Sequence, residues 1–110
     1  MVTAILRPHL VGAVKDALDG LAVLGMTVTE LHGYGREMGP RMLARGADHH
    51  ADLIARVKIE VLVDDEAAAA VTDAVRRAAW TGKVGDGKVW VTPIDTVVRV
   101  RTGERGSDAV

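Results

Sequence analysis

The chain has 110 residues, a formal net charge of −1 and no cysteine. This length predicts one domain, and the balanced charge provides no overall attraction to nucleic acid or to an anionic membrane. The lack of cysteine excludes a disulfide framework and thiolate catalysis, and it favours a reducing cytoplasm. Residues 1–8 lack the features of a signal peptide, and no apolar run approaches the roughly 20 residues that cross a bilayer. We therefore expect a cytoplasmic protein without direct membrane insertion.

The first half of the chain predicts two strands, a helix and a long loop. Residues 2–7 resemble a short strand that ends at Pro8, because proline cannot donate to a strand ladder. Apolar residues recur at helical spacing from about residue 10 to residue 21, and residues 26–34 predict a second strand. Residues 35–55 combine glycines, a proline and many charges without periodicity, so we interpret them as one long mobile loop for partner recognition.

The second half predicts a strand, a helix and a further strand. Residues 57–63 alternate between apolar and mostly polar side chains, which is the clearest strand pattern in the chain. The segment 64–78 begins with acidic residues, continues through four alanines and has two arginines at its far end, as expected for a helix with a favourable dipole. The glycine-rich residues 82–87 then predict a loop that leads into a strand at 89–91.

The order of elements predicts a ferredoxin-like α+β domain of the type βαββαβ, with the long loop between the second and third strands. We expect a last extended segment at 96–101, followed by a polar tail at 102–110. Both helices would cover one sheet face, so the other face would expose aliphatic side chains from several strands. Because a contiguous apolar patch usually marks an interface, we expect a symmetric homo-oligomer.

The strongest local chemical signal is the glycine-rich segment 81–88, TGKVGDGK. Backbone N–H groups in a glycine turn can form an anion-binding concavity, and the ammonium group of Lys88 adds a charge suited to polyphosphate. The segment lacks the spacing of a Walker A loop. On its own it is equally consistent with a glycine hairpin and a solvated lysine.

A second signal comes from Arg99 and Arg101, which lie two residues apart on an expected strand and would therefore point to the same face. Two guanidinium groups side by side are tolerated when an anion bridges them, and their planar forks match phosphate oxygens. The alternative is a solvated edge strand whose charges limit aggregation. The two signals together favour a phosphate site.

These segments also carry a family resemblance. TGKVGDGKVWVTPI at 81–94 and VRVRTGE at 98–104 resemble the second signature and the C-terminal region of PII nitrogen-regulatory proteins. The resemblance extends to Arg7-Pro8, to segments within 26–36 and to the Arg-Gly-Ala of 45–47, so it covers nearly the whole chain. The tail is most similar to actinobacterial members.

The resemblance implies a single PII domain over residues 1–110, assembled as a homotrimer with ATP or ADP in each cleft between subunits. The nucleotide-binding positions that it implies are Ile5, Thr27, Gly35, Arg36, Glu60, Leu62, Gly85, Asp86, Gly87, Lys88, Arg99 and Arg101. The residues from Gly85 to Lys88 match the loop that wraps the phosphates, and the two arginines match those that close on them. The other positions match the adenine and ribose surroundings or the base of the mobile loop.

The mobile loop departs from the family pattern. His49 and Ala44 replace tyrosines of familiar members, so we expect no modification by tyrosine nucleotidylation. Glu37 replaces a glutamine that helps to hold magnesium and 2-oxoglutarate, and Arg56 replaces a lysine that pairs with a 2-oxoglutarate carboxylate. Glu37 can still bind magnesium, but its charge should oppose a dianionic effector. Arg45 belongs to the part of the loop expected to contact partner proteins.

We therefore predict a non-enzymatic signalling protein that senses ATP against ADP, with magnesium and 2-oxoglutarate as further candidate ligands. Its targets would be proteins such as an ammonium transporter or a nitrogen-metabolism enzyme. Two alternatives remain: a divergent PII-like paralogue that senses another metabolite, and a nucleotide-dependent enzyme with His49 or His50 as a base. The pair of histidines is more consistent with solvated loop residues than with a metal site, which usually needs three or four convergent ligands.

Overall fold

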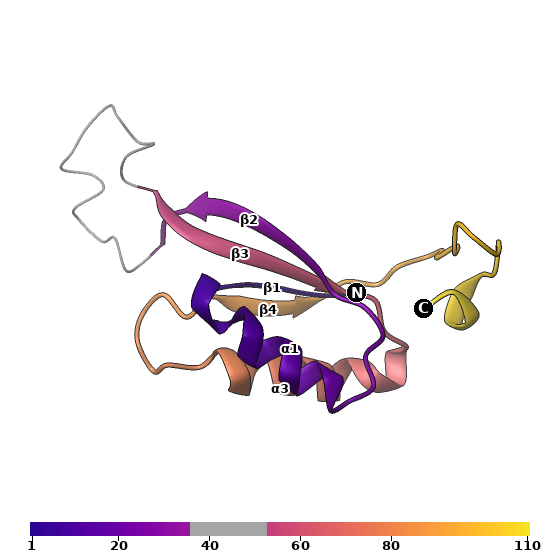
Figure 1. Cartoon of the computed structure of the whole chain (residues 1–110), viewed down its shortest axis with the longest axis horizontal. Coiled ribbons are helices and arrows are strands. Elements are labelled where there is room, and N and C mark those ends of the chain that lie inside the picture. Colours follow the sequence, from indigo (N-terminus) through magenta and orange to yellow (C-terminus); the bar gives the residue numbers. More distant parts are fainter. Residues whose placement is uncertain (36–52) are drawn as a thin grey trace.

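The computed structural model describes residues 1–35 and 53–110 (Figure 1). The elements in chain order are β1 (Val2–Leu6), the short 3₁₀ helix η1 (Pro8–Leu10), α1 (Val11–Asp19), β2 (Thr27–Gly33), β3 (Ile54–Val61), α3 (Asp65–Ala79), β4 (Lys88–Val91) and the 3₁₀ helix η3 (Gly106–Ala109). Within the described part of the chain, no helix is both long and apolar enough to span a membrane.

The four strands form one antiparallel sheet in the order β2-β3-β1-β4, and α1 and α3 lie together against one of its faces (Figure 1). The central strand β1 pairs on both sides, so that Thr3 lies opposite Glu60 of β3 and opposite Trp90 of β4. This arrangement is the predicted ferredoxin-like α+β fold, and the prediction is confirmed.

The core forms where the two helices meet the sheet. Alternate strand residues and one stripe of each helix are buried, as the periods of strand and helix require. The buried apolar residues are Val2, Ala4, Leu6, Val14, Leu18, Val57, Ile59, Val61, Val71, Val75 and Ala79. Acidic residues in the first turn of α3 and arginines in its last turn match the helix dipole. The core is wholly aliphatic, as the scarcity of aromatic residues suggests.

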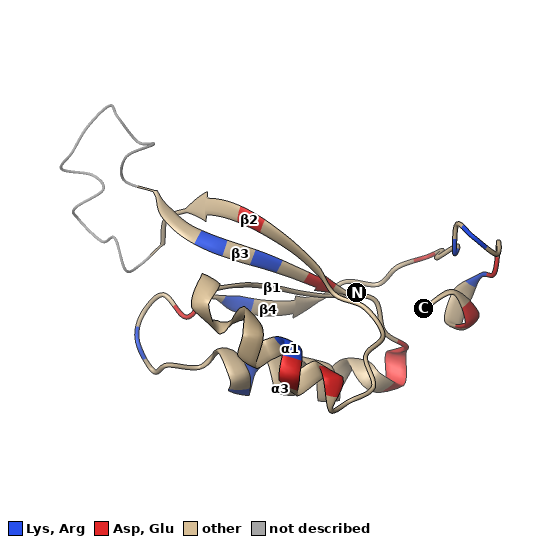
Figure 2. Ribbon diagram, viewed as in Figure 1, with Lys and Arg blue, Asp and Glu red and all other residues tan. Residues whose placement is uncertain are grey.

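The sheet face opposite the helices is more polar than the sequence pattern predicted. Along β3 the charged side chains on this face are Arg56, Lys58 and Glu60, which appear as charged bands in Figure 2. Thr3 and Thr29 lie beside them in register. The same face also carries Ile5, Leu31 and Ile54, which are partly exposed. The expected aliphatic side chains from several strands are therefore present, but charged side chains interrupt them.

The prediction of a last strand at 96–101 was wrong. In this segment the ladder is reduced to one isolated bridge, between Val98 and Arg105. The chain turns back on itself between these two residues, so Arg99 and Arg101 lie at a turn rather than along one strand face. In Figure 1 the segment leads away from the sheet beyond the end of β4.

Candidate functional site

The glycine-rich loop between α3 and β4 depends on backbone conformations that favour glycine. Gly82, Gly85 and Gly87 have φ values of 84°, 103° and 92°. These lie in a region that L-residues with a side chain rarely adopt. A Cβ atom on Gly87 would lie 1.7 Å from the carbonyl oxygen of Ile5, so only glycine allows the loop to approach β1 this closely.

Asp86 organises this loop from within. Its carboxylate accepts hydrogen bonds from the hydroxyl of Thr81, from the amide of Thr81 at 2.8 Å and from the amide of Gly82 at 3.0 Å. The Thr81 hydroxyl, followed by the Thr81 amide, holds the pKa of Asp86 well below its ordinary value. Asp86 was predicted as a nucleotide-binding position, but its carboxylate is engaged by donors of its own loop.

Arg7, immediately after β1, ties the loop to the sheet. Its Nε donates to Oδ1 of Asp86 at 3.2 Å, and its Nη2 donates to the carbonyl oxygen of Val84 at 3.0 Å. Arg7 belongs to the segments that carry the family resemblance, but no role was predicted for it. No local pattern could have found this contact, because 79 positions separate Arg7 from Asp86.

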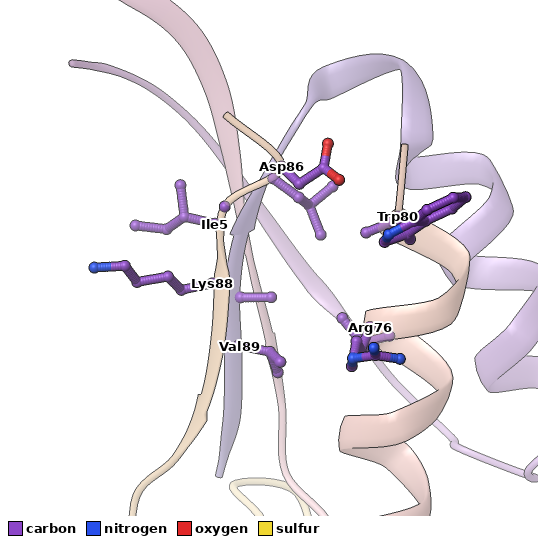
Figure 3. A pocket seen from close by; sticks show the side chains of 11 residues that line it. Ile5, Arg76, Trp80, Asp86, Lys88 and Val89 are labelled. Carbon is purple, nitrogen blue, oxygen red and sulfur yellow. The ribbon is translucent and has the colours of Figure 1, made fainter. Parts of the chain in front are cut away.

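Two further predicted residues, Ile5 and Lys88, lie beside the loop. They are directly opposite each other on β1 and β4. Figure 3 shows both side chains extending away from α3, toward the open side of the sheet. Gly35 is exposed and lies shortly after β2, beyond the last residue pair of β2 and β3, which is Gly33 with Ile54. The structure thus groups the predicted phosphate-loop residues and Ile5 at one end of the domain, and we name them the loop half-site.

A small cavity lies next to the loop half-site, between α3 and the sheet. Its volume is about 100 Å³. The residues that line it include Val75, Arg76, Ala79, Trp80 and Val89 (Figure 3). Ligand pockets usually measure about 300 Å³ or more, so this cavity is too small to enclose a nucleotide. Trp80 is 66% exposed, and its ring lies next to Gly82 of the loop.

A second group of predicted residues gathers elsewhere in the domain. A pocket of about 440 Å³, within the usual size of a ligand site, is lined by Met1, Leu24, Gly25, Thr27, Glu60, Leu62, Arg99, Ala109 and Val110. Four of these residues were predicted to bind nucleotide: Thr27, Glu60, Leu62 and Arg99. We name these four the cleft half-site. Sequence reasoning missed the contribution of Leu24, Gly25 and the end of the tail, which carry no recognisable motif.

Arg99 already has protein partners in this pocket. Its Nη1 lies 3.0 Å from Oε1 of Glu104, and its Nη2 donates to the backbone oxygen of Val110 at 3.3 Å. The turn that holds this pair closes through a hydrogen bond from the Gly103 amide to the Arg99 carbonyl at 2.8 Å. Arg101 is exposed and is not among the residues that line the pocket. The structure therefore does not bring the two arginines together on one ligand.

The two half-sites are separated within one chain. The cleft half-site lies where β2 begins and β3 ends, beside the first residue of β1. The loop half-site lies at the other end of β1, where Ile5 and Arg7 meet the glycine-rich loop. In Figure 1 the chain end marked N, near the cleft half-site, and the loop between α3 and β4 are on opposite sides of the domain. One chain presents two different surfaces to a ligand.

Several predicted positions fall outside the residues that the structure describes: Arg36, Glu37, Arg45, His49 and His50. Arg56 is described; it lies on β3 opposite Leu31, and its Nη1 donates to the carbonyl of Ala55 at 2.9 Å. Within residues 1–35 and 53–110, no group of three or more histidine, aspartate or glutamate side chains could hold a metal ion. The predicted magnesium ligand Glu37 is not among those residues.

Residues 1–104 match the sequence profile of the family described as nitrogen regulatory protein P-II. The nitrogen regulatory protein P-II of Azospirillum brasilense is 45% identical over 109 residues, which cover 99% of this chain and 97% of that protein. Its counterpart in Mesorhizobium japonicum is 47% identical over the same shares. A crystal structure of Arabidopsis thaliana PII bound to citrate superimposes with a TM-score of 0.81 at 34% identity, covering 98% of this chain and 85% of that one.

The fold and these matches first define the class, which is a regulatory protein with a ferredoxin-like fold. The chain belongs to the PII family of nitrogen regulatory proteins. The resemblance seen in the sequence is thereby confirmed.

Proposed function

We propose that this chain is a single-domain PII signalling protein that binds ATP and ADP and regulates target proteins in the cytoplasm. The observation that carries the proposal is the loop half-site, where positive-φ glycines and Lys88 offer donors and a cation for phosphate. Family membership supplies the regulatory role. No catalytic step is proposed, since PII proteins act as regulators.

The cleft half-site supplies what the loop half-site lacks. Thr27 and Glu60 offer polar groups for a ribose or a base, Leu62 offers an apolar wall, and Arg99 offers a fork for phosphate. Neither surface alone encloses a nucleotide. We therefore propose that the nucleotide lies between the loop half-site of one subunit and the cleft half-site of its neighbour.

Head-to-tail contacts form a closed ring when the rotation between subunits closes, and on the family resemblance we propose that the ring is a homotrimer. The exposed apolar side chains of the C-terminal segment support a role in assembly. Ile94 and Val98 are about half exposed and Val100 is fully exposed in the single chain. A neighbouring subunit would cover these side chains.

Further ligands and targets are proposed with the same site. Magnesium would be held through Glu37, and 2-oxoglutarate would bind weakly against the charge of Glu37, with Arg56 as its partner. The Arabidopsis relative was solved with citrate, which supports binding of a small anionic ligand by this fold. The loop that contains Arg45 would contact a target such as an ammonium transporter or a nitrogen-metabolism enzyme.

Calorimetry with ATP and ADP tests the nucleotide site. Both should bind, and Arg99→Ala should weaken ATP by about ten- to a hundredfold, because it removes a charge-assisted phosphate pair of roughly 1.5–3 kcal/mol. Arg105→Ala, on the same segment, is the control and should bind as the unmutated protein does. No detectable binding of either nucleotide would overturn the proposed function.

Mixed assemblies test the sharing of the site between subunits. Light scattering should give three times the chain mass. Lys88→Ala subunits alter the loop half-site and Arg99→Ala subunits alter the cleft half-site, so random mixing in equal amounts should restore about a quarter of the sites to full affinity. If all site residues came from one chain, mixing would restore none.

A further inference from the structure

We infer that Arg7 is a positioning residue for the phosphate loop of the proposed nucleotide site. It acts through Asp86 and Val84, to which it donates at 3.2 and 3.0 Å, and not through contact with the ligand. The inference rests on the proposed function. Arg7 is not one of the residues proposed to contact the nucleotide. Its basis is the geometry of three segments: the end of β1, the glycine-rich loop and the residues that directly follow α3.

The backbone aims Arg7 at the loop. Arg7 precedes Pro8, and a residue before proline is restricted to extended conformations. Arg7 has φ −66° and ψ 135°, as this restriction requires, and Pro8 begins η1. The side chain therefore leaves β1 in a fixed direction. It is only 20% exposed, and the Asp86 side chain that it meets is 24% exposed.

The planar guanidinium suits this contact because it serves two acceptors at once. Nε reaches a carboxylate oxygen of Asp86 while Nη2 reaches the carbonyl oxygen of Val84. The two acceptors belong to residues two positions apart, so the fork fixes the loop between them as well as its distance from β1. A lysine could supply the charge but has a single point donor group with no fork.

Arg7 also completes the neutralisation of Asp86. Oδ1 accepts from Arg7 and from the Thr81 hydroxyl, and Oδ2 accepts from the amides of Thr81 and Gly82. A carboxylate in a loop that is proposed to bind polyphosphate would repel the ligand if its charge were uncompensated. The arginine offsets that charge from the β1 side. The loop can then present its remaining donors and Lys88 to phosphate.

A second tie acts at the neighbouring position. Gly87 lies so close to the Ile5 carbonyl that no Cβ fits between them. The loop is thus held on β1 through Gly87 at one point and through Arg7 at another. Loss of the Arg7 tie should leave the fold intact while freeing the part of the loop that precedes Gly87.

The test compares Arg7→Gln with the control Arg77→Gln, which breaks an exposed ion pair to Asp73 of 2.9 Å on α3. In the ligand-free protein, Arg7→Gln should speed hydrogen exchange at the amides of Thr81 and Gly82. It should also weaken ATP and inorganic triphosphate by about tenfold and leave adenosine unchanged. Arg77→Gln should change none of these values.

Distinct results would overturn the inference. Weaker ATP binding with unchanged loop exchange would make Arg7 a direct ligand contact, and equal weakening of ATP and adenosine would make it a general structural residue. Arg7→Lys keeps the charge, so full recovery by this variant would refute the role of the fork. If the unmutated protein binds no nucleotide, the proposed function fails. The rate of hydrogen exchange in ligand-free Arg7→Gln still decides whether Arg7 holds the loop.

Discussion

The glycine-rich loop at 81–87 and the C-terminal segment at 92–110 carry the two kinds of phosphate-binding group in the proposed site, but they are held in different ways. The loop is bonded to itself through Asp86 and to β1 through Arg7. The C-terminal segment folds back on itself through one isolated bridge and through the contacts of Arg99 with Glu104 and Val110, and Val100 at its turn is fully exposed. The first region has its shape within one chain, and the second presents apolar side chains to solvent.

This difference separates two costs of binding. A preorganised loop loses little conformational freedom when a ligand arrives, whereas a weakly held segment must be ordered by its ligand or by a neighbouring subunit. Changes in the loop should therefore alter both the free energy of unfolding and the affinity for the ligand. Changes in the C-terminal segment should alter binding or assembly and leave the fold almost unaffected.

Gly87→Ala should have the largest effect and tests the rigidity of the loop. The positive φ and the clash with the Ile5 carbonyl should lower the free energy of unfolding by on the order of 3 kcal/mol. Urea denaturation measures this change. The control is Gly12→Ala, since a Cβ at this α1 position meets nothing within 4 Å and should stabilise by about 0.5–1 kcal/mol. Equal stability of the two variants would contradict the close approach of loop and strand.

Asp86→Asn should have an intermediate, pH-dependent effect. Hydrogen bonds from Thr81 lower the pKa of the folded Asp86 below its ordinary value of 3.8. A carboxyl group with a lowered pKa contributes stability that is fully present above the ordinary pKa and is lost as the pH falls through the folded value.

The measurement is urea unfolding of the unmutated protein and of Asp86→Asn from about pH 6 to about pH 2. The unmutated protein should have the higher free energy of unfolding, and this difference should shrink toward the acid end of the range. Asp95→Asn, at an exposed position outside the loop, is the control. An advantage that stayed constant down to the acid limit would mean that the Asp86 charge does not stabilise the loop.

Glu104→Gln should have the smallest effect and tests the C-terminal segment. It removes the charge that pairs with Arg99 in the free chain and so makes Arg99 more available to phosphate. A half-exposed pair of this kind contributes up to about 1 kcal/mol, so ATP should bind up to about fivefold more tightly. Asp19→Asn, which breaks the exposed pair with Lys15, should leave ATP affinity unchanged. Weaker ATP binding by Glu104→Gln would indicate that the pair positions Arg99 instead of occupying it.

Periodic patterns predicted the fold well because they report local burial. The alternation at 57–63 predicted β3, which spans Ile54–Val61, and the alanine-rich segment at 64–78 predicted α3, which spans Asp65–Ala79. The segment 96–101 misled for the same reason: its valines alternate with arginines as in a strand, but a strand also needs a ladder partner. That partner is reduced here to the single bridge.

The candidate site was only partly predictable. The glycines of the loop marked it directly, because their conformational freedom is a property of the residue itself. The hydrogen bonds of Asp86 within its own loop depend on the folded conformation of that loop. The contact of Asp86 with Arg7 joins segments that are far apart in sequence. The placement of Ile5 opposite Lys88, and of Thr27 opposite Glu60, required the sheet register, which no motif encodes.

The placement of Trp80 gives this protein an intrinsic optical reporter. The chain has two tryptophans. The Trp80 ring is two-thirds exposed beside Gly82, whereas Trp90 lies on the open sheet face opposite Thr3. With Trp90 replaced by phenylalanine, the emission wavelength and quenching of the remaining indole would follow the water content around the loop. Loop motion can then be timed in solution without attaching a dye.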